Sequence, residues 1–375
     1  MRIGVMLRHY EQKEGGVKVY TKHLLPLLFS MGSRHDYVLM YANPKLIGTY
    51  RQYSNVYETA STFPGAILWD QIAVPWMAHR NRVDLIFNPK FTVPLLAKAK
   101  KIFVLHGSEW FVIPEHFLWY DRLYFRNFVP LYCHSADAFI AVSNAVKDDV
   151  VRFVGVSPDK VVAIHNGFEP TRFTRVIDPQ RLDEVRRKYQ LPERFIVWVG
   201  QIESRKNVGR LLQAFARIRG EFPHELVIAG AQRFTFPMAA GAAEELKLIE
   251  RLNLQDRVRA TGWISHEDLP AVYSLADLFA FPSLYEGFGI PLLEAMACGC
   301  PIVTANTCAP PEVVDSAAYL VDPLSVDDIE NGLRSVLSDS QERSRLISAG
   351  LIRARDFSWE KCARQVLDLF ESVMQ

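Results

Sequence analysis

One segment, residues 278–304, contains a strand, a glycine-rich turn, a helix and a second strand in direct succession. The apolar runs 278–281 and 302–304 predict buried parallel strands, and Pro291 suits the first turn of a helix that ends at Gly299. Ligands of such βαβ units bind beyond the carboxyl ends of the strands. The glycine turn lies at that end, so this segment predicts both a parallel sheet and the position of a binding site.

The same alternation of short apolar runs with helical or loop segments occurs in two series along the chain. It predicts an α/β protein with two parallel sheets, and 375 residues with 49% hydrophobic side chains can fill two cores. Between the series, residues 166–192 carry prolines around a charged segment and predict an interdomain linker. The predicted strands are residues 3–7, 37–41, 85–87, 101–105 and 138–142, then 195–199, 225–229, 258–261, 278–281 and 302–304.

Composition argues against several other classes of protein. The net charge is +1, which disfavours general nucleic-acid binding, although residues 1–170 carry +5 and the remainder −4. The five cysteines include no CxxC pair and predict reduced thiols rather than disulfides or zinc ligands. The apolar start of the chain is too short for a signal peptide, and no stretch approaches the length of a membrane-spanning helix. We therefore expect a cytoplasmic protein.

Two carboxylates are placed around the glycine turn. Glu286 lies in the turn and Glu294 on the first turns of the following helix, so both can face one cleft and accept hydrogen bonds from ligand hydroxyls. A surface turn before an amphipathic helix is the alternative, but the turn, helix start, helix stop and next strand all agree with a site. Free backbone N–H groups at the positive end of the helix suit a phosphate or sugar hydroxyls, and they belong to Gly287, Phe288, Gly289 and Ile290.

At these residues the chain resembles the retaining glycosyltransferases of family 4, whose E-x7-E signature matches Glu286 and Glu294 within SLYEGFGIP. The stretch VGQIESRKN, residues 199–207, resembles the family's donor-phosphate loop, and the resemblance extends over nearly the whole chain. It implies a GT-B fold, in which two Rossmann-like domains face a central cleft. The implied parts are an acceptor-side domain of residues 1–168, a nucleotide-sugar-binding domain of residues 169–356, and a final helix, residues 357–375, that packs back on the first domain.

Arg205 and Lys206 follow a predicted strand at the edge of the sheet where ligands bind. Two adjacent cations there can neutralise a leaving diphosphate, whereas a solvated basic turn is the alternative. Many relatives carry arginine directly after the strand's glycine, where this chain has Gln201. We therefore expect Arg205 to take part of that task.

Further residues are predicted to contact the donor. Gly15 and Gly16 precede a helical run, so their backbone can approach the diphosphate. They lack GxGxxG spacing and the chain has no Walker A sequence, which makes NAD-dependent redox chemistry and ATP hydrolysis poor alternatives. His106 follows a predicted strand and resembles the family's histidine that touches the donor sugar; a structural histidine is the alternative. The remaining candidates are Trp263 and Ile264, expected to face the base, and His9, a weaker candidate of the same kind as His106.

Residues 117–132, FLWYDRLYFRNFVPLY, combine aromatic side chains at helical spacing with Arg122 and Arg126. Such a segment can serve a membrane interface or a lipid-linked acceptor, or it can be a helix with one face buried in the core. We favour the buried helix face, because amphipathic helices pack in cores far more often than they bind bilayers. Peripheral contact with the inner face of the membrane is the alternative.

The resemblance implies a retaining hexosyltransferase, with GDP-mannose as the best guess for the donor and a hydroxyl of a glycan or lipid-linked molecule as the acceptor. The expected catalytic residues are His106, Arg205, Lys206 and Glu286. The chain has no Asp-x-Asp and no compact His/Cys cluster, so we expect neither a metal nor another cofactor. The alternatives are a sugar phosphorylase or sugar-nucleotide isomerase on the same fold, and a non-catalytic sugar-nucleotide-binding protein.

Overall fold

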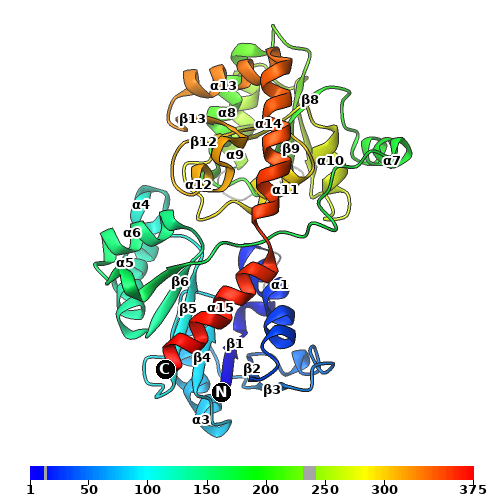
Figure 1. The fold of residues 1–375 in the computed structure, drawn as a ribbon. Coiled ribbons are helices and arrows are strands. Elements are labelled where there is room, and N and C mark those ends of the chain that lie inside the picture. Colours follow the sequence, from blue (N-terminus) through cyan, green and yellow to red (C-terminus); the bar gives the residue numbers. More distant parts are fainter. Residues whose placement is uncertain (12–14, 231–241) are drawn as a thin grey trace. The chain divides into compact units, whose positions relative to one another are not determined.

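The computed structural model describes residues 1–11, 15–230 and 242–375. The chain forms two compact units, residues 1–167 with 358–375, and residues 168–357. Each unit is built on a sheet whose described strands are all parallel, with helices on its faces (Figure 1). The predicted α/β class with two Rossmann-like parallel sheets is therefore confirmed.

In the first unit the strand order is β3-β2-β1-β4-β5-β6-β7. The chain moves outward from β1 to β3 and then returns to β4 on the other side of β1, so the strand order reverses between β1 and β4. Open α/β sheets bind ligands at the carboxyl ends of the strands beside such a reversal. The strands are β1 (Arg2–Met6), β2 (Asp36–Tyr41), β3 (Val56–Ala60), β4 (Leu85–Asn88), β5 (Lys100–Leu105), β6 (Ala138–Ala141) and β7 (Val161–Ala163). The helices are α1 (Gly16–Met31), α2 (Ala66–Leu68), α3 (Val74–Arg80), α4 (Glu109–Val112), α5 (Trp119–Ser135), α6 (Asn144–Val154) and α15 (Trp359–Met374).

The second unit repeats this plan with the strand order β10-β9-β8-β11-β12-β13, and the order reverses between β8 and β11. Its strands are β8 (Phe195–Val199), β9 (Glu225–Ala229), β10 (Val258–Gly262), β11 (Leu278–Phe281), β12 (Ile302–Ala305) and β13 (Tyr319–Val321). Its helices are α7 (Pro179–Tyr189), α8 (Val208–Ile218), α9 (Ala242–Arg251), α10 (Leu269–Leu275), α11 (Ile290–Ala297), α12 (Pro310–Val314), α13 (Val326–Ser338) and α14 (Ser340–Arg353).

Side-chain periodicity explains how these elements pack. In α8, Leu211, Leu212, Phe215 and Ile218 recur at three- and four-residue spacing, and all four are buried in the core of the second unit. The central strands are buried on both faces, which is why they read as continuous apolar runs.

The predicted linker of residues 166–192 contains a helix that the sequence analysis did not predict. Asp178 caps the start of α7 by accepting a hydrogen bond from Gln180 N at 3.0 Å, and Pro179 occupies the first turn. Only Val185 of this helix is buried, so the segment lacks the apolar periodicity that marks the other helices. The Asp-Pro pair was the available signal.

The predicted buried face of residues 117–132 is present only in part. Of α5 only Val129, Tyr132 and Cys133 are buried, while the half-buried Phe125 stacks on Trp110 with 4.3 Å between ring centroids. The exposed large side chains in or next to the helix are Leu118, Trp119, Tyr120, Leu123, Phe128 and Leu131.

Helix α15 completes the first unit by packing against α1. The Trp359 ring stacks on His23 with 5.5 Å between centroids and meets Tyr20 edge-on at 5.7 Å. Gly167 lies against the start of this helix, where a Cβ would come within 2.2 Å of Trp359 N and 2.4 Å of the Ser358 carbonyl carbon. The close approach of two backbone segments therefore requires glycine at position 167.

We predict that Gly167→Ala destabilises the protein, because backbone atoms cannot move aside as a flexible side chain can. The expected loss in free energy of unfolding is roughly 1–3 kcal/mol, the usual cost of overpacking. Calorimetric unfolding measures it. The matched control is Gly209→Ala in α8, where the nearest atom lies 3.7 Å from the added Cβ and a gain of roughly 0.5–1 kcal/mol is expected. Equal stability of the two variants would contradict the assigned role of Gly167.

Candidate active site

The buried side chain of Asn207 joins the loops that follow the two strands at the reversal of the second sheet. Its Nδ2 donates to the carbonyl oxygens of Pro282 at 2.8 Å and Pro323 at 2.7 Å. Next to it, Leu284 N donates to the carbonyl oxygen of Arg205 at 2.7 Å. Asn207 has φ 58°, a left-handed conformation that asparagine tolerates better than most residues. We did not predict Asn207 as a site residue, although its place directly after the two cations was a usable signal.

This connection places three of the predicted catalytic residues together. Lys206 Nζ lies 2.6 Å from Glu286 Oε1, and Arg205 Nη1 lies 3.6 Å from Glu286 Oε2. The Lys206 ammonium also lies 4.9 Å from the centroid of the Phe281 ring, while Arg205 pairs with Glu203 at 2.8 Å. The alternative of a solvated basic turn does not fit Lys206, whose side chain is 12% exposed.

Burial and charge act in opposite directions on this cluster. Burial alone would raise the pKa of Glu286, but Lys206 and Arg205 lower it below its ordinary value, so this carboxylate stays ionised. Burial lowers the pKa of Lys206, an effect that Glu286 partly offsets. The second unit therefore holds a desolvated cation whose internal counter-ion is Glu286.

The glycine turn adopts the conformation that the sequence predicts. Gly289 precedes α11 with φ 97°, and a Cβ there would approach Leu292 Cδ1 to 2.8 Å. Pro291 lies in the first turn of the helix, as predicted. The Phe288 side chain is buried edge-on against Phe357 with 5.8 Å between ring centroids, so this side chain does not face a ligand.

Glu294 is buried in α11 and lies in a different electrostatic environment from Glu286. Burial and the charge of Glu169 raise the pKa of Glu294 to about 8, while Arg172 lowers it. In the free protein this side chain is therefore largely protonated at neutral pH and can donate a hydrogen bond as well as accept one.

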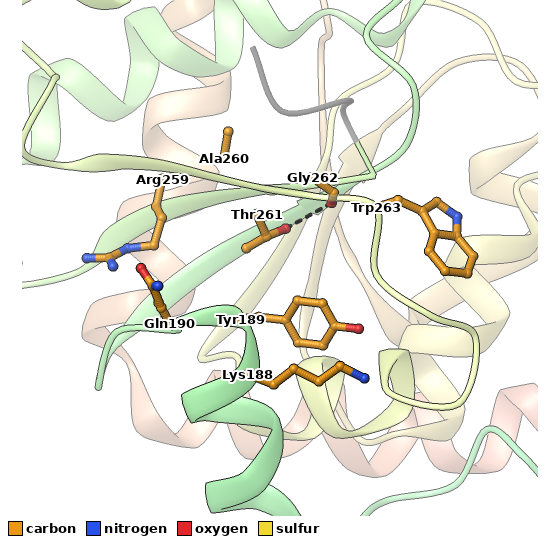
Figure 2. Close-up of a pocket in the computed structure, with 8 residues that line it drawn as sticks. All are labelled: Lys188, Tyr189, Gln190, Arg259, Ala260, Thr261, Gly262 and Trp263. Atoms are coloured by element: carbon orange, nitrogen blue, oxygen red, sulfur yellow. Dashed lines mark hydrogen bonds between the residues drawn. The ribbon is translucent and has the colours of Figure 1, made fainter. Parts of the chain in front are cut away.

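A cavity of about 350 Å³ lies at the edge strand β10 and includes Trp263 (Figure 2). Trp263 is 62% exposed, whereas Ile264 is buried and cannot use its side chain for a ligand. The loop after Trp263 is fixed by Asp268, which accepts hydrogen bonds from Tyr189 OH at 2.6 Å and Lys188 Nζ at 2.7 Å. The cavity is lined by Lys188, Tyr189, Gln190, Arg259, Ala260, Thr261, Gly262 and Trp263, so Trp263 is its one member among the predicted donor residues.

The first unit holds the other predicted residues. His106 Nε2 lies 2.8 Å from the carbonyl oxygen of Pro89 and must donate to it, which leaves Nδ1 as the acceptor of the ring. Burial lowers the pKa of His106 to about 4, so the ring is neutral at physiological pH. Gly15 and Gly16 are exposed at the start of α1, and a Cβ at Gly16 would meet no described atom within 4 Å.

The described residues contain no group of three or more His, Cys, Asp or Glu side chains that could hold a metal ion. None of the helices that they form is long and apolar enough to cross a membrane.

Comparisons with known proteins identify the fold and the family. Residues 14–172 match the family model described as Glycosyltransferase Family 4, and residues 182–352 match the one described as Glycosyl transferases group 1. Among solved structures, a glycosyltransferase from Rickettsia africae superposes with a TM-score of 0.77 at 16% identity and covers 100% of this chain and 98% of its own. HepE from Anabaena in complex with UDP and glucose gives a TM-score of 0.76 at 20% identity, covering 99% of this chain and 100% of its own. The fold is thus that of the GT-B glycosyltransferases.

Relatives with higher sequence identity narrow the assignment from the fold to a family. The O-antigen chain mannosyltransferase B of Escherichia coli is 32% identical over 302 residues, which are 78% of this chain and 76% of the relative. The serotype-specific mannosyltransferase WbdA of Escherichia coli is 30% identical over 64% of this chain, but that match spans 29% of WbdA. The chain belongs to glycosyltransferase family 4, and its mannosyltransferase relatives confirm the predicted resemblance.

We predict that Glu294→Gln changes the pH dependence of stability in a defined direction. The unfolded chain loses this proton near pH 4.5, whereas the folded protein keeps it to about pH 8. Between these values the folded state binds more protons, so the free energy of unfolding of the wild type falls as pH rises. In this window the free energy of unfolding of the variant should rise relative to that of the wild type by up to about 1.4 kcal/mol for each pH unit.

Urea unfolding of both proteins across this pH range measures the difference. Glu169→Gln provides a second variant, because it removes a charge that raises the pKa of Glu294 and should move the upper end of the window to lower pH. A difference between Glu294→Gln and the wild type that does not change with pH would show that Glu294 is not protonated in the folded state.

Proposed function

We propose that this glycosyltransferase transfers a hexose from a nucleotide diphosphate sugar to a hydroxyl of a glycan or lipid-linked acceptor, with retention at the anomeric carbon and without a metal. The observation that carries the proposal is the cluster of Arg205, Lys206 and Glu286 at the carboxyl ends of β8 and β11. Parallel sheets bind ligands at this position, and desolvated cations there suit a diphosphate.

The proposed chemistry depends on charge that develops as the glycosidic bond breaks. The leaving diphosphate gains negative charge and accepts the acceptor's proton on the same face of the sugar, while Lys206 and Arg205 stabilise that charge. Fixed cations in a site shielded from water stabilise developing charge more than they stabilise the bound substrate. Glu286 and the backbone of residues 287–290 would hold sugar hydroxyls, and Glu294 the ribose.

GDP-mannose is the donor that we propose. The support is the set of relatives named as mannosyltransferases, at 30% to 32% identity. Thermal shift with a panel of nucleotide sugars tests this choice, because a ligand that binds the native state raises its melting temperature. Release of GDP from GDP-mannose in the presence of a synthetic α-mannoside then separates a transferase from a non-catalytic binder. A phosphorylase would instead form sugar phosphate when inorganic phosphate is supplied.

We predict that Lys206→Ala lowers kcat by roughly 10²–10³, with a smaller change in the dissociation constant of the donor. Arg205→Ala should behave similarly if it replaces the cation absent at Gln201. Rates are measured with EDTA present, since the proposed reaction needs no metal. Near-normal kcat in both variants would exclude this loop as the phosphate site.

Loss of stability must be separated from loss of catalysis in this experiment. Lys206→Ala leaves the buried Glu286 with Arg205 alone at 3.6 Å, and an uncompensated buried charge costs about 3–5 kcal/mol. The double variant Lys206→Ala/Glu286→Gln removes that charge and should recover stability while kcat stays low. Arg217→Ala, a half-exposed cation on α8, is the control for removal of a positive charge elsewhere.

We also propose that the exposed face of α5 contacts an anionic membrane surface. Trp119 and Leu123 lie one turn apart and are 74% and 58% exposed, and the exposed Arg122 and Arg126 flank them. Aromatic and aliphatic side chains bordered by arginine suit the interface of a bilayer with anionic lipids.

We predict that Trp119→Ser/Leu123→Ser abolishes flotation of the protein with vesicles that contain phosphatidylglycerol. Arg126→Gln should weaken binding to these vesicles, and vesicles of phosphatidylcholine alone should bind the wild type less. Ile177→Ser removes an equally exposed apolar side chain from the second unit and serves as the control. If the double variant instead changes only the oligomeric state in solution, the face binds a second copy of the chain and the membrane proposal fails.

A further inference from the structure

Two cations and two histidines gather at the reversal of the first sheet, where the order changes between β1 and β4. Arg8 and His9 follow β1, Lys90 follows β4, and His106 follows β5. All four come from the carboxyl ends of neighbouring parallel strands, the edge at which open α/β sheets bind ligands. The proposed donor-phosphate residues Arg205 and Lys206 belong to the second unit, so this cluster is a separate set of groups.

Arg8 is held by a buried carboxylate. Its Nε lies 3.3 Å from Asp70 Oδ1, and Asp70 Oδ2 accepts a hydrogen bond from Thr92 Oγ1 at 2.9 Å. Asp70 and Thr92 are both buried, while the Arg8 side chain is 26% exposed. Asp70 can neutralise one of the two cations at this edge.

Lys90 is the second cation, and nothing in the described part of the chain neutralises it through an ion pair. Its Nζ lies 5.5 Å from the centroid of the Phe91 ring. Lys90 is half-buried, and burial together with the charge of Arg8 lowers its pKa, while the charge of Asp70 partly offsets this effect. Such a desolvated cation costs free energy that a bound anion recovers.

The loop that carries Lys90 is fixed in place before any ligand binds. Lys90 N donates to Asn88 Oδ1 at 3.1 Å, and Asn88 Nδ2 donates to Thr92 O at 2.7 Å. Gln71 donates to the carbonyl oxygen of Val93 at 2.9 Å. The backbone that carries Lys90 is therefore preorganised, which reduces the ordering cost of binding.

The two histidines add hydrogen-bond acceptors rather than charge. His9 Nε2 lies 3.0 Å from Thr21 Oγ1, whose own proton goes to Val17 O at 2.7 Å, so His9 donates from Nε2. Burial and the charge of Lys90 lower the pKa of His9 to about 3. With His106 in the same tautomer, both rings are neutral and each keeps Nδ1 as its acceptor atom.

We propose that Arg8 and Lys90 bind an oxyanion group of the acceptor, so that the substrate class is a hydroxyl-bearing sugar with a phosphate or carboxylate group. This inference rests on the proposed function, because it assigns the acceptor of the same transfer reaction. Two cations against one internal carboxylate leave one positive charge for the ligand, and the neutral imidazoles beside them add no further charge.

Calorimetric titration of the full chain tests the proposal with matched probes. With saturating GDP present, α-mannose 1-phosphate should bind at least about tenfold more tightly than methyl α-mannoside, the range expected for a hydrogen bond to a charged group. The same comparison of affinity between methyl glucuronide and methyl glucoside tests a carboxylate in place of the phosphate. Lys90→Gln should remove the preference for the charged probe, whereas Lys98→Gln, an exposed lysine of the same loop, should keep it.

Each other outcome has a defined meaning. Equal affinity for charged and neutral probes, or equal effects of Lys90→Gln and Lys98→Gln, overturns the proposal. If Lys90→Gln weakens the binding of GDP as strongly as the binding of the charged probe, the cluster binds the donor diphosphate and the acceptor assignment fails. If GDP does not bind the wild type, the proposed donor is wrong, and the same comparison without GDP still tests this cluster.

The variants also need a measure of folding. Lys90→Gln removes a cation that has no ion pair among the described residues, so its melting temperature should equal or exceed that of the wild type. Arg8→Gln is combined with Asp70→Asn, so that no buried carboxylate is left alone. This pair should lose the same preference for the charged probe as Lys90→Gln.

Discussion

In each unit the strand order reverses once, and this reversal decides which loops can share a ligand. Helical connections cover opposite faces of a parallel sheet on the two sides of a reversal, so the loops at its carboxyl edge separate and leave room. Lys206 and Glu286 meet because β8 and β11 are neighbours although 78 residues lie between Val199 and Leu278. Arg8 and Lys90 gather by the same rule beside β1 and β4.

The buried cations of the two units differ in how their charge is compensated. Lys206 has an internal counter-ion at 2.6 Å, whereas Lys90 forms no ion pair among the described residues and only feels the charge of Asp70, which pairs with Arg8. In the proposed mechanism a diphosphate competes with Glu286 for Lys206. The ion pair of Glu286 and Lys206 forms again when the nucleotide leaves. Such an internal competitor limits affinity for the product. At Lys90 an anionic ligand displaces no ion pair of the described residues, so it gains more from neutralising the charge.

Much of the fold follows from the sequence because central parallel strands are buried on both faces. The predicted strands 195–199, 225–229 and 278–281 coincide with β8, β9 and β11. The strands that were not predicted, β3, β7 and β13, all lie at sheet edges. They are short or half-exposed, as the sequence VYETA of β3 illustrates, so no apolar run marks them. Helix α7 was not predicted because it also lacks an apolar pattern, since Val185 is its one buried residue.

The site was less accessible to sequence reasoning, since spacing along the chain does not measure burial. Glu286 and Glu294 are both buried and eight positions apart, yet paired cations lower the pKa of one while burial and Glu169 raise the pKa of the other. Asn207 and Asp70 bond to partners that are distant in sequence, and no local pattern identifies them or Lys90. A signature motif thus locates the edge of the sheet where chemistry occurs, while protonation at that edge depends on neighbours that only the folded chain brings into contact.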